Sequence, residues 1–109
     1  MKKLGKLYRL GEWSVKPDKI PEFIEAWQAG VDWIAQNLPD DGEGILLQDS
    51  ENPNKFISLA FSSNPEKVQE AMSRPEFQEL QSRTRALCEN VRPHRMQVVG
   101  YSSSNKKDE

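Results

Sequence analysis

The only histidine of the chain is His94, and histidine is the side-chain type that most readily exchanges protons near neutral pH. It lies between Pro93 and Arg95, at the predicted beginning of the last strand. One interpretation is a general base within reach of a substrate, and the other is a strand-end histidine bonded to backbone or water. The only cysteine, Cys88, has no base beside it in the sequence, so we expect a small buried side chain there rather than a nucleophile.

Three aromatic side chains could stack on a flat ligand. Trp13 and Phe61 share one predicted face of a sheet, and Trp27 lies on the helix stripe opposite them. Arg9 has the same strand parity as Trp13 and could meet an anionic group of such a ligand. Core packing explains the aromatic residues as well, and a surface position is the alternative for the arginine.

Several other chemistries have no support in the sequence. It contains no Cys-x-x-Cys, no pair of histidines at ligand spacing, no glycine-rich phosphate loop and no Gly-x-Ser-x-Gly elbow. We therefore expect neither a metal nor another cofactor. A net charge of −2 argues against a nucleic-acid partner, and segment 55–61 lacks the glycine that marks the RNA-binding strand of RNA-recognition motifs.

The order in which the hydrophobic periodicity changes predicts the fold. It alternates at 8–15, is helical at 20–38, alternates at 44–48 and 56–61, is helical as far as Val91, and alternates from His94 to Tyr101. This is β-α-β-β-α-β, a ferredoxin-like α+β unit with an antiparallel sheet. Its helices cover one face of the sheet and leave the other face to solvent or to a partner.

Local signals predict where the helices begin and end. Asp18 is a candidate N-cap for the first helix, and the loop 39–42 ends it. The second helical region begins with Asn64 as N-cap before Pro65. Segment 73–76 has capping-box spacing and predicts a second helix start after a break.

Strand parity separates the strand side chains into two sets. The set that we expect under the helices is apolar: Trp13, Val15, Ile45, Leu47, Ile57, Leu59, Phe61, Met96 and Val98. The opposite set mixes apolar and polar side chains, which is too apolar for an open face. We therefore predict that a second copy of the chain covers it, in a homodimer with these interface residues: Tyr8, Leu10, Leu46, Phe56, Val99 and Tyr101.

The length and the two ends of the chain limit its organisation. With 109 residues it has room for one domain, which we place at 1–101, and the polar residues 102–109 are expected to form a disordered tail. The beginning of the chain shows no apolar run that could serve as a signal peptide. We therefore expect a cytoplasmic protein that does not associate with membranes.

Three short segments resemble a known family. Trp13-Ser14-Val15-Lys16-Pro17, Asn52-Pro53-Asn54-Lys55-Phe56 and Arg74-Pro75-Glu76-Phe77 are similar to segments of the antibiotic biosynthesis monooxygenase domain, which belongs to the dimeric α+β barrel superfamily. The resemblance implies a homodimer in which two sheets form a barrel, with a cleft between sheet and helices in each subunit. Some members of the family oxygenate electron-rich aromatic substrates without a cofactor, and others degrade haem.

The functional residues of the family can be compared with single positions of this sequence. The asparagine, tryptophan and histidine that the haem-degrading branch requires fall at Gly11, Ala71 and Gln81, which argues against haem degradation. In an oxygenase of this family, His94 would deprotonate a phenolic substrate so that its carbanion can pass an electron to oxygen. The two hypotheses are therefore such a monooxygenase, acting on a small aromatic compound, and a dimeric binding or accessory protein that keeps the cleft without turnover.

Overall fold

The computed structural model describes residues 5–38 and 42–104. Its elements follow the order β1 (Leu7–Val15), the 3-10 turn η1 (Pro17–Lys19), α1 (Ile20–Asn37), β2 (Glu43–Gln48), β3 (Lys55–Phe61), α2 (Pro65–Met72), α3 (Pro75–Ala86) and β4 (Cys88–Gln97). This order confirms the predicted β-α-β-β-α-β arrangement, with the second helical region divided in two at Pro75.

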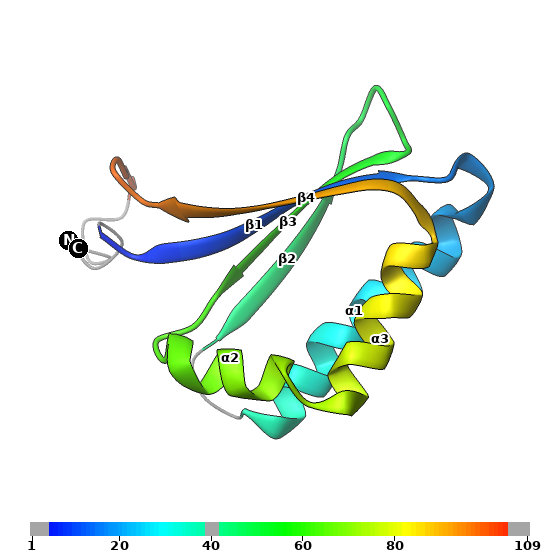
Figure 1. Cartoon of the computed structure of the whole chain (residues 1–109). Helices are drawn as coiled ribbons and strands as arrows, with labels where there is room; N and C mark the ends of the chain where they lie inside the picture. The colour runs from blue at the N-terminus through cyan, green and yellow to red at the C-terminus, as the bar shows by residue number, and fades with distance from the viewer. Residues whose placement is uncertain (1–4, 39–41, 105–109) are drawn as a thin grey trace.

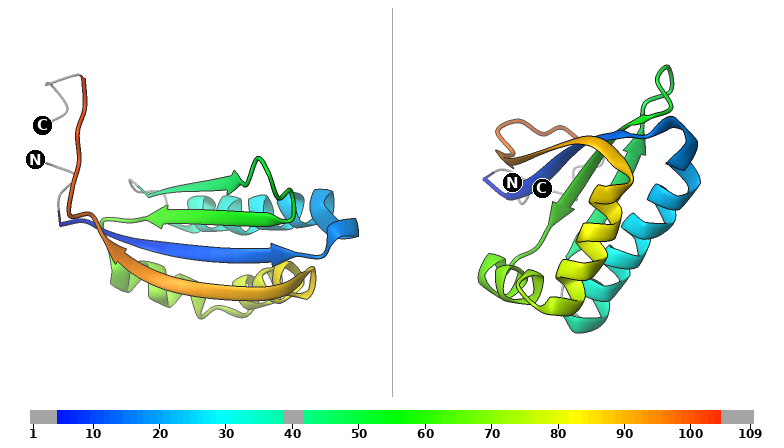
Figure 2. Two further views of the ribbon diagram at one scale, coloured as in Figure 1. Left: turned by 90° about the horizontal axis from the view of Figure 1, so that it is seen from above. Right: turned by 45° about the vertical axis from the view of Figure 1, so that its right-hand side comes forward.

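The four strands form one sheet in the order β2-β3-β1-β4, and every neighbouring pair is antiparallel. The three helices lie together on one face of this sheet (Figure 1). Seen from above, the strands lie side by side in front of the helices, and β1 occupies the middle beside β3 (Figure 2). The result is the predicted α+β, ferredoxin-like fold, with one face of the sheet left open; we refer to it as the open face.

The helix starts agree with the sequence signals in part. The Asn64 side chain caps α2 by accepting a hydrogen bond from the backbone N–H of Lys67 at 3.1 Å, as predicted. The second helix start near Pro75 is also confirmed, but neither α1 nor α3 has the predicted side-chain cap. Asp18 lies within the 3-10 turn, and α1 begins without a side-chain cap. Ser73 does not cap α3, because its hydroxyl donates backward to the carbonyl of Glu70 at 2.6 Å.

The last strand begins earlier than the sequence predicts. α3 ends at Ala86 and β4 begins at Cys88, so the expectation of helix as far as Val91 is wrong. Pairing with β1 overrides the helical spacing here, since Trp13 lies opposite Val91 and Val15 opposite Cys88. Pro93 is tolerated because β4 is an edge strand, where a missing N–H need not break a ladder.

The assignment of side chains to the two faces is correct for β1 and wrong for the other three strands. Trp13 lies opposite Phe56 in the ladder, and paired residues share a face, so Phe56 and its alternate neighbours lie under the helices. Leu46 also packs against the core. The open face instead carries Tyr8 and Leu10, as predicted, together with Ile45, Leu47, Ile57, Leu59, Phe61 and Met96. β2 and β3 have apolar side chains on both faces, so a one-residue slip exchanges the two sets without violating the pattern.

The core lies where the helices meet the exit of β1. Val15 and Phe23 are fully buried and Phe56 is 3% exposed. The Phe23 ring centroid lies 4.9 Å from that of Phe56 and 5.3 Å from that of Trp13. Tilted aromatic pairs at these distances add to the free energy that area burial alone supplies.

The chain beyond β4 leaves the sheet. Val98 is still bonded to the residue that precedes β1, since its N–H donates to the carbonyl of Lys6 at 2.9 Å. The segment that follows crosses the end of the sheet, away from the strand direction (Figure 2). Val99 is 86% exposed there, and Tyr101 lies further along, so neither belongs to the open face as predicted. Residues 39–41 of the predicted loop 39–42 and most of the predicted tail lie outside the described residues.

Candidate functional site

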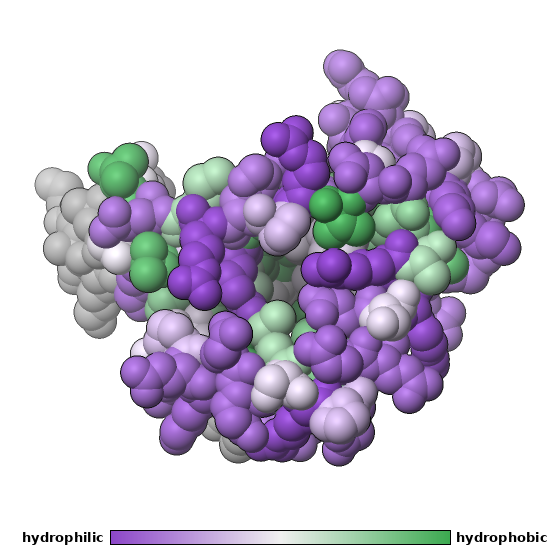
Figure 3. Space-filling model, in the orientation of Figure 1, coloured by the Kyte–Doolittle hydropathy of each residue, from purple (hydrophilic) through white to green (hydrophobic). Residues whose placement is uncertain are grey.

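A cavity of about 440 Å³ lies between the sheet and the three helices. The floor comes from β1 and β3, the walls from α1, α2 and α3, and part of the rim from β4. Figure 3 shows the molecule hollowed between β4 and the helices, with apolar side chains inside and polar ones around the opening. This volume is typical of sites for small molecules, and most of the lining is hydrophobic.

The floor of the cavity is fixed by one hydrogen bond. The indole N–H of Trp13 donates to the Ser58 hydroxyl at 2.9 Å, from β1 to β3. Gly11 lies directly beside this pair, and a Cβ there would come within 2.7 Å of the Ser58 oxygen and 2.8 Å of the indole nitrogen. A glycine is therefore required at this position for the bond to form.

Arg9 reaches the cavity from the beginning of β1. Its guanidinium contacts the thioether sulfur of Met72, the last residue of α2. Burial lowers the pKa of Arg9, and the positive charge of Arg95 adds to the effect. Arg95 lies directly opposite it on β4. None of the carboxylates in the described part of the chain forms an ion pair with Arg9.

The structure brings together only part of the predicted site. Arg9, Trp13 and Trp27 all border the cavity. Phe61 borders it at the end of β3, but its ring packs on Tyr8 of the open face, with the centroids 5.3 Å apart. His94 lies on the open face, opposite Leu10 in the ladder, and is not among the cavity residues.

On the open face His94 has a partner of its own. Its Nε2 lies 2.6 Å from a carboxylate oxygen of Glu12, the next open-face residue of β1 after Leu10. Both side chains remain partly exposed. The predicted neighbourhood of His94 with Trp13 is therefore wrong, since the two side chains lie on opposite sides of the sheet.

Other residues that line the cavity were not among the predicted site residues. α2 and α3 contribute Met72, Phe77, Leu80, Gln81 and Thr84. Most of them belong to the apolar stripe of a helix. Their spacing predicts that they are buried, but it does not show that they line a cavity. Gln81, where the resemblance placed the histidine of the haem-degrading branch, borders the cavity.

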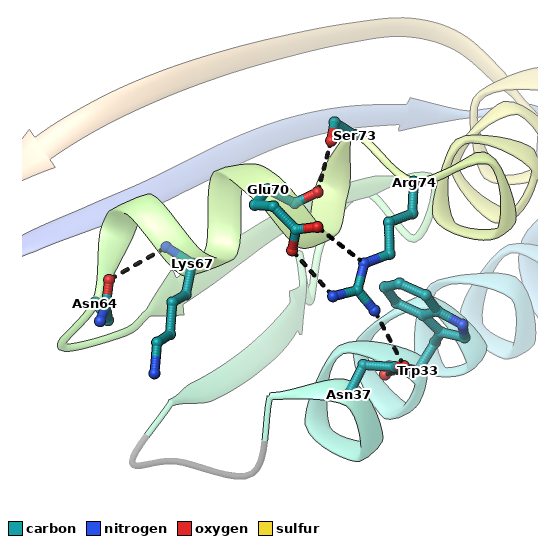
Figure 4. Close-up of polar contacts among 7 residues, drawn as sticks. All are labelled: Trp33, Asn37, Asn64, Lys67, Glu70, Ser73 and Arg74. Carbon is teal, nitrogen blue, oxygen red and sulfur yellow. Dashed lines mark hydrogen bonds and ion pairs between the residues drawn. The ribbon is translucent and has the colours of Figure 1, made fainter.

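The break between α2 and α3 is held against α1 by Arg74. Its guanidinium donates two hydrogen bonds to the carboxylate of Glu70, at 3.0 and 3.3 Å, and lies 5.9 Å from the ring centroid of Trp33 (Figure 4). The Glu70 carboxylate raises the pKa of Arg74. Trp33 also packs on Phe77, with the ring centroids 5.8 Å apart. Phe77 lines the cavity, so the contacts of Arg74 and Trp33 support the cavity wall.

Cys88 offers a first test of the packing. Its thiol donates to the carbonyl of Thr84, and burial raises the pKa of Cys88 to about 11. The ordinary value is 9.0, so we expect roughly a hundredfold less thiolate than in an exposed thiol and correspondingly slow alkylation by iodoacetamide at pH 8. The shift favours the neutral thiol in the folded state, so its contribution to stability is complete below pH 9 and is lost as the pH rises toward 11.

The measurement compares the alkylation rate of the native protein with that in 8 M urea, followed by mass spectrometry. A native rate equal to the rate in urea would contradict the burial of this thiol. The same experiment on the Lys16→Gln variant serves as control, because the positive charge of Lys16 lowers the pKa of Cys88 and its removal slows the native reaction further.

Two kinds of site are missing from the described residues. Residues 5–38 and 42–104 contain no group of three or more His, Cys, Asp or Glu side chains that could hold a metal ion. Within the same ranges, no helix combines the length and the apolar character needed to span a membrane.

Comparison with known proteins gives matches to solved structures alone. No family model and no curated protein matches the chain. The crystal structure of SnoaB, a cofactor-independent oxygenase from Streptomyces nogalater, superimposes with a TM-score of 0.75 at 15% identity, over 89% of this chain and 96% of that one. A crystal structure of an antibiotic biosynthesis monooxygenase matches with a TM-score of 0.69 at 14% identity, over 86% and 99%. The chain has the antibiotic biosynthesis monooxygenase fold.

The same fold also occurs in proteins without a stated activity. A conserved protein from Methanosarcina mazei Go1 matches with a TM-score of 0.72 at 15% identity, over 88% of this chain and 95% of that one. One antibiotic biosynthesis monooxygenase fold can carry different chemistry, or none, on different side chains. The function of this chain must therefore be argued from its own cavity.

Proposed function

We propose that the cavity binds a flat, electron-rich aromatic compound and that the protein is a cofactor-independent monooxygenase. The observation that carries the proposal is the cavity itself, of about 440 Å³, with Trp13, Trp27 and Phe77 among its lining residues. Aromatic side chains supply large stacking surfaces for a flat ring system. The fold shared with SnoaB, a cofactor-independent oxygenase, supports the choice of reaction.

The reaction needs no cofactor if the substrate supplies the electrons. A phenolic ring with an adjacent methylene group can ionise, and the resulting carbanion passes an electron to O2. In the complete reaction two C–H bonds break and a C=O bond forms, while the second oxygen atom leaves as water. The substrate loses four electrons and O2 gains them. The part of the protein is to hold the ring in a water-poor cavity in a fixed orientation.

A second candidate is a binding protein of the same fold without turnover. The observation in its favour is that His94 lies on the open face, and that neither a histidine nor a cysteine occurs among the described residues around the cavity. Both candidates require a ligand in the cavity. They differ only in whether oxygen is consumed.

One titration and one oxygen measurement test both candidates. We expect 1,8-dihydroxyanthrone to quench the fluorescence of Trp13 and Trp27 with saturation, and oxygen uptake to rise above the rate without protein, one O2 for each product formed. Saturable binding without extra uptake would favour the binding protein. No binding of this or other flat aromatic probes would contradict the proposal.

A matched pair of variants on α1 assigns the binding to the cavity. Gly30 borders it, and a Cβ there would lie 3.9 Å from the Phe77 ring, so Gly30→Leu places a larger side chain in the ligand volume. We expect it to weaken binding at least about tenfold by steric exclusion. Ala29→Leu, one residue earlier on an exposed position, is the control and leaves binding unchanged.

We also infer that two copies of the chain associate through the open face. Several large apolar side chains remain exposed on it, among them Ile45, Leu47 and Met96. They lie on β2 and β4, the two edges of the sheet, and Leu59 of β3 and Leu10 of β1 lie between them on the same face, so the apolar surface extends across the sheet. An isologous contact between two such faces would bury the patch and is the arrangement that the family resemblance implies.

A further inference from the structure

We propose that the ligand of the cavity carries a carboxylate, which Arg9 and Arg95 bind at the β1–β4 end of the sheet. The inference rests on the proposed function, because it assigns the substrate class of the same cavity. It narrows that class from flat aromatic compounds to flat aromatic acids. The observations behind it concern charge and burial, not the fold.

The first observation is a guanidinium without a counter-charge. Arg9 is partly buried, borders the cavity, and has only the thioether of Met72 as a side-chain partner among the described residues. A thioether is a weak acceptor, whereas a guanidinium has five N–H donors arranged for a carboxylate. Burial of such a cation costs free energy unless an anion compensates it.

The second observation is a pair of like charges. Arg95 lies directly opposite Arg9 in the antiparallel ladder, so both side chains leave the sheet on the helix side. Like charges at this position destabilise the sheet, and the charge of Arg95 lowers the pKa of Arg9. An anion between the two arginines would convert this repulsion into two attractive interactions.

The third observation is the position of Arg9 in the cavity. Arg9 and Trp13 lie on the same side of β1, with Gly11 between them, so an aromatic ring stacked near the indole can direct a substituent toward the guanidinium. Bidentate arginine–carboxylate contacts are specific in geometry as well as strong. One strand, β1, therefore supplies both an aromatic and a cationic side chain to the cavity.

The test compares two probes that differ only in charge. Naphthalene-2-carboxylate and naphthalene-2-carboxamide are titrated against the wild-type protein by tryptophan fluorescence and by calorimetry. We expect the carboxylate to bind at least about tenfold more tightly, because its hydrogen bonds to a guanidinium are charge-assisted. The preference should decrease at high salt.

Arginine variants test where the carboxylate of the probe binds. Arg9→Gln should lose at least about tenfold in affinity for the carboxylate and keep its affinity for the amide. Arg92→Gln is the matched control, because it removes the same charge from β4 on the open face, opposite Glu12. If Arg9→Gln does not fold, Arg95→Gln at an exposed position replaces it, with an expected loss of about threefold for the carboxylate alone.

The outcomes separate this inference from the proposed function. If the protein binds the amide or 1,8-dihydroxyanthrone without preferring the carboxylate, the aromatic acid is excluded and the aromatic cavity stands. If the preference exists but persists in both Arg9→Gln and Arg95→Gln, the carboxylate binds elsewhere and the inference is overturned. If none of the aromatic probes binds, the inference and the proposed function are both wrong.

Discussion

A Phe56→Glu substitution should unfold the protein. The Phe56 side chain is 3% exposed and its ring lies 4.9 Å from that of Phe23. Truncation of a buried phenylalanine to alanine costs about 3–5 kcal/mol, and a carboxylate at the same place adds the penalty of a buried unpaired charge. Domains of this size are stable by only about 5–15 kcal/mol.

Circular dichroism and urea denaturation measure this effect. We expect Phe56→Ala to lower the free energy of unfolding by about 3–5 kcal/mol, and Phe56→Glu to show no cooperative urea transition. The control is Gln69→Glu at an exposed position of α2, with a change of about 0.5 kcal/mol or less. A folded Phe56→Glu protein that only changes its oligomeric state would contradict the placement of Phe56 under the helices.

A Leu47→Glu substitution should leave the chain folded and separate the proposed dimer. Leu47 is 49% exposed on the open face, beside Ile57 of β3. In an isologous contact each substitution occurs twice, so two carboxylates enter the interface and each must be desolvated. We expect the dissociation constant to rise at least about a hundredfold, which corresponds to about 2.7 kcal/mol.

Light scattering across a range of protein concentrations measures the dissociation constant. Wild-type protein should have the mass of a dimer, and Leu47→Glu that of a monomer with an unchanged circular dichroism spectrum. Gln69→Glu introduces the same charge at an exposed position of α2 and should remain dimeric. A monomeric wild-type protein, or a Leu47→Glu variant that stays dimeric, would exclude the open face as the interface.

The order of the elements could be predicted from the sequence because each has a local cause. Asn64 and Pro65 specify a helix start by themselves, and the stripe of α1 needs no partner to be recognised. The beginning of β4 could not be predicted in this way. Cys88 and Val91 have helical spacing, and only their pairing with β1 makes them extended.

The two faces of the sheet show a second limit. β3 has large apolar residues on both sides, such as Phe56 and Ile57, so alternation alone leaves its orientation undetermined. The same error placed His94 in the cleft. Arg9 and Trp13 border the cavity from β1, the one strand whose predicted orientation agrees with the structure, and Trp27 borders it from α1.

The position of β1 in the sheet has a mechanical consequence. Its odd-numbered side chains, Arg9 and Trp13, reach the cavity, while the even-numbered Leu10 and Glu12 belong to the open face. A single layer of backbone therefore separates a bound ligand from a neighbouring subunit. Any tilt of this strand that improves contact with the ligand also moves the residues on its other side. In the proposed dimer, ligand binding in one cavity would therefore displace residues that contact the second subunit, because only β1 lies between them.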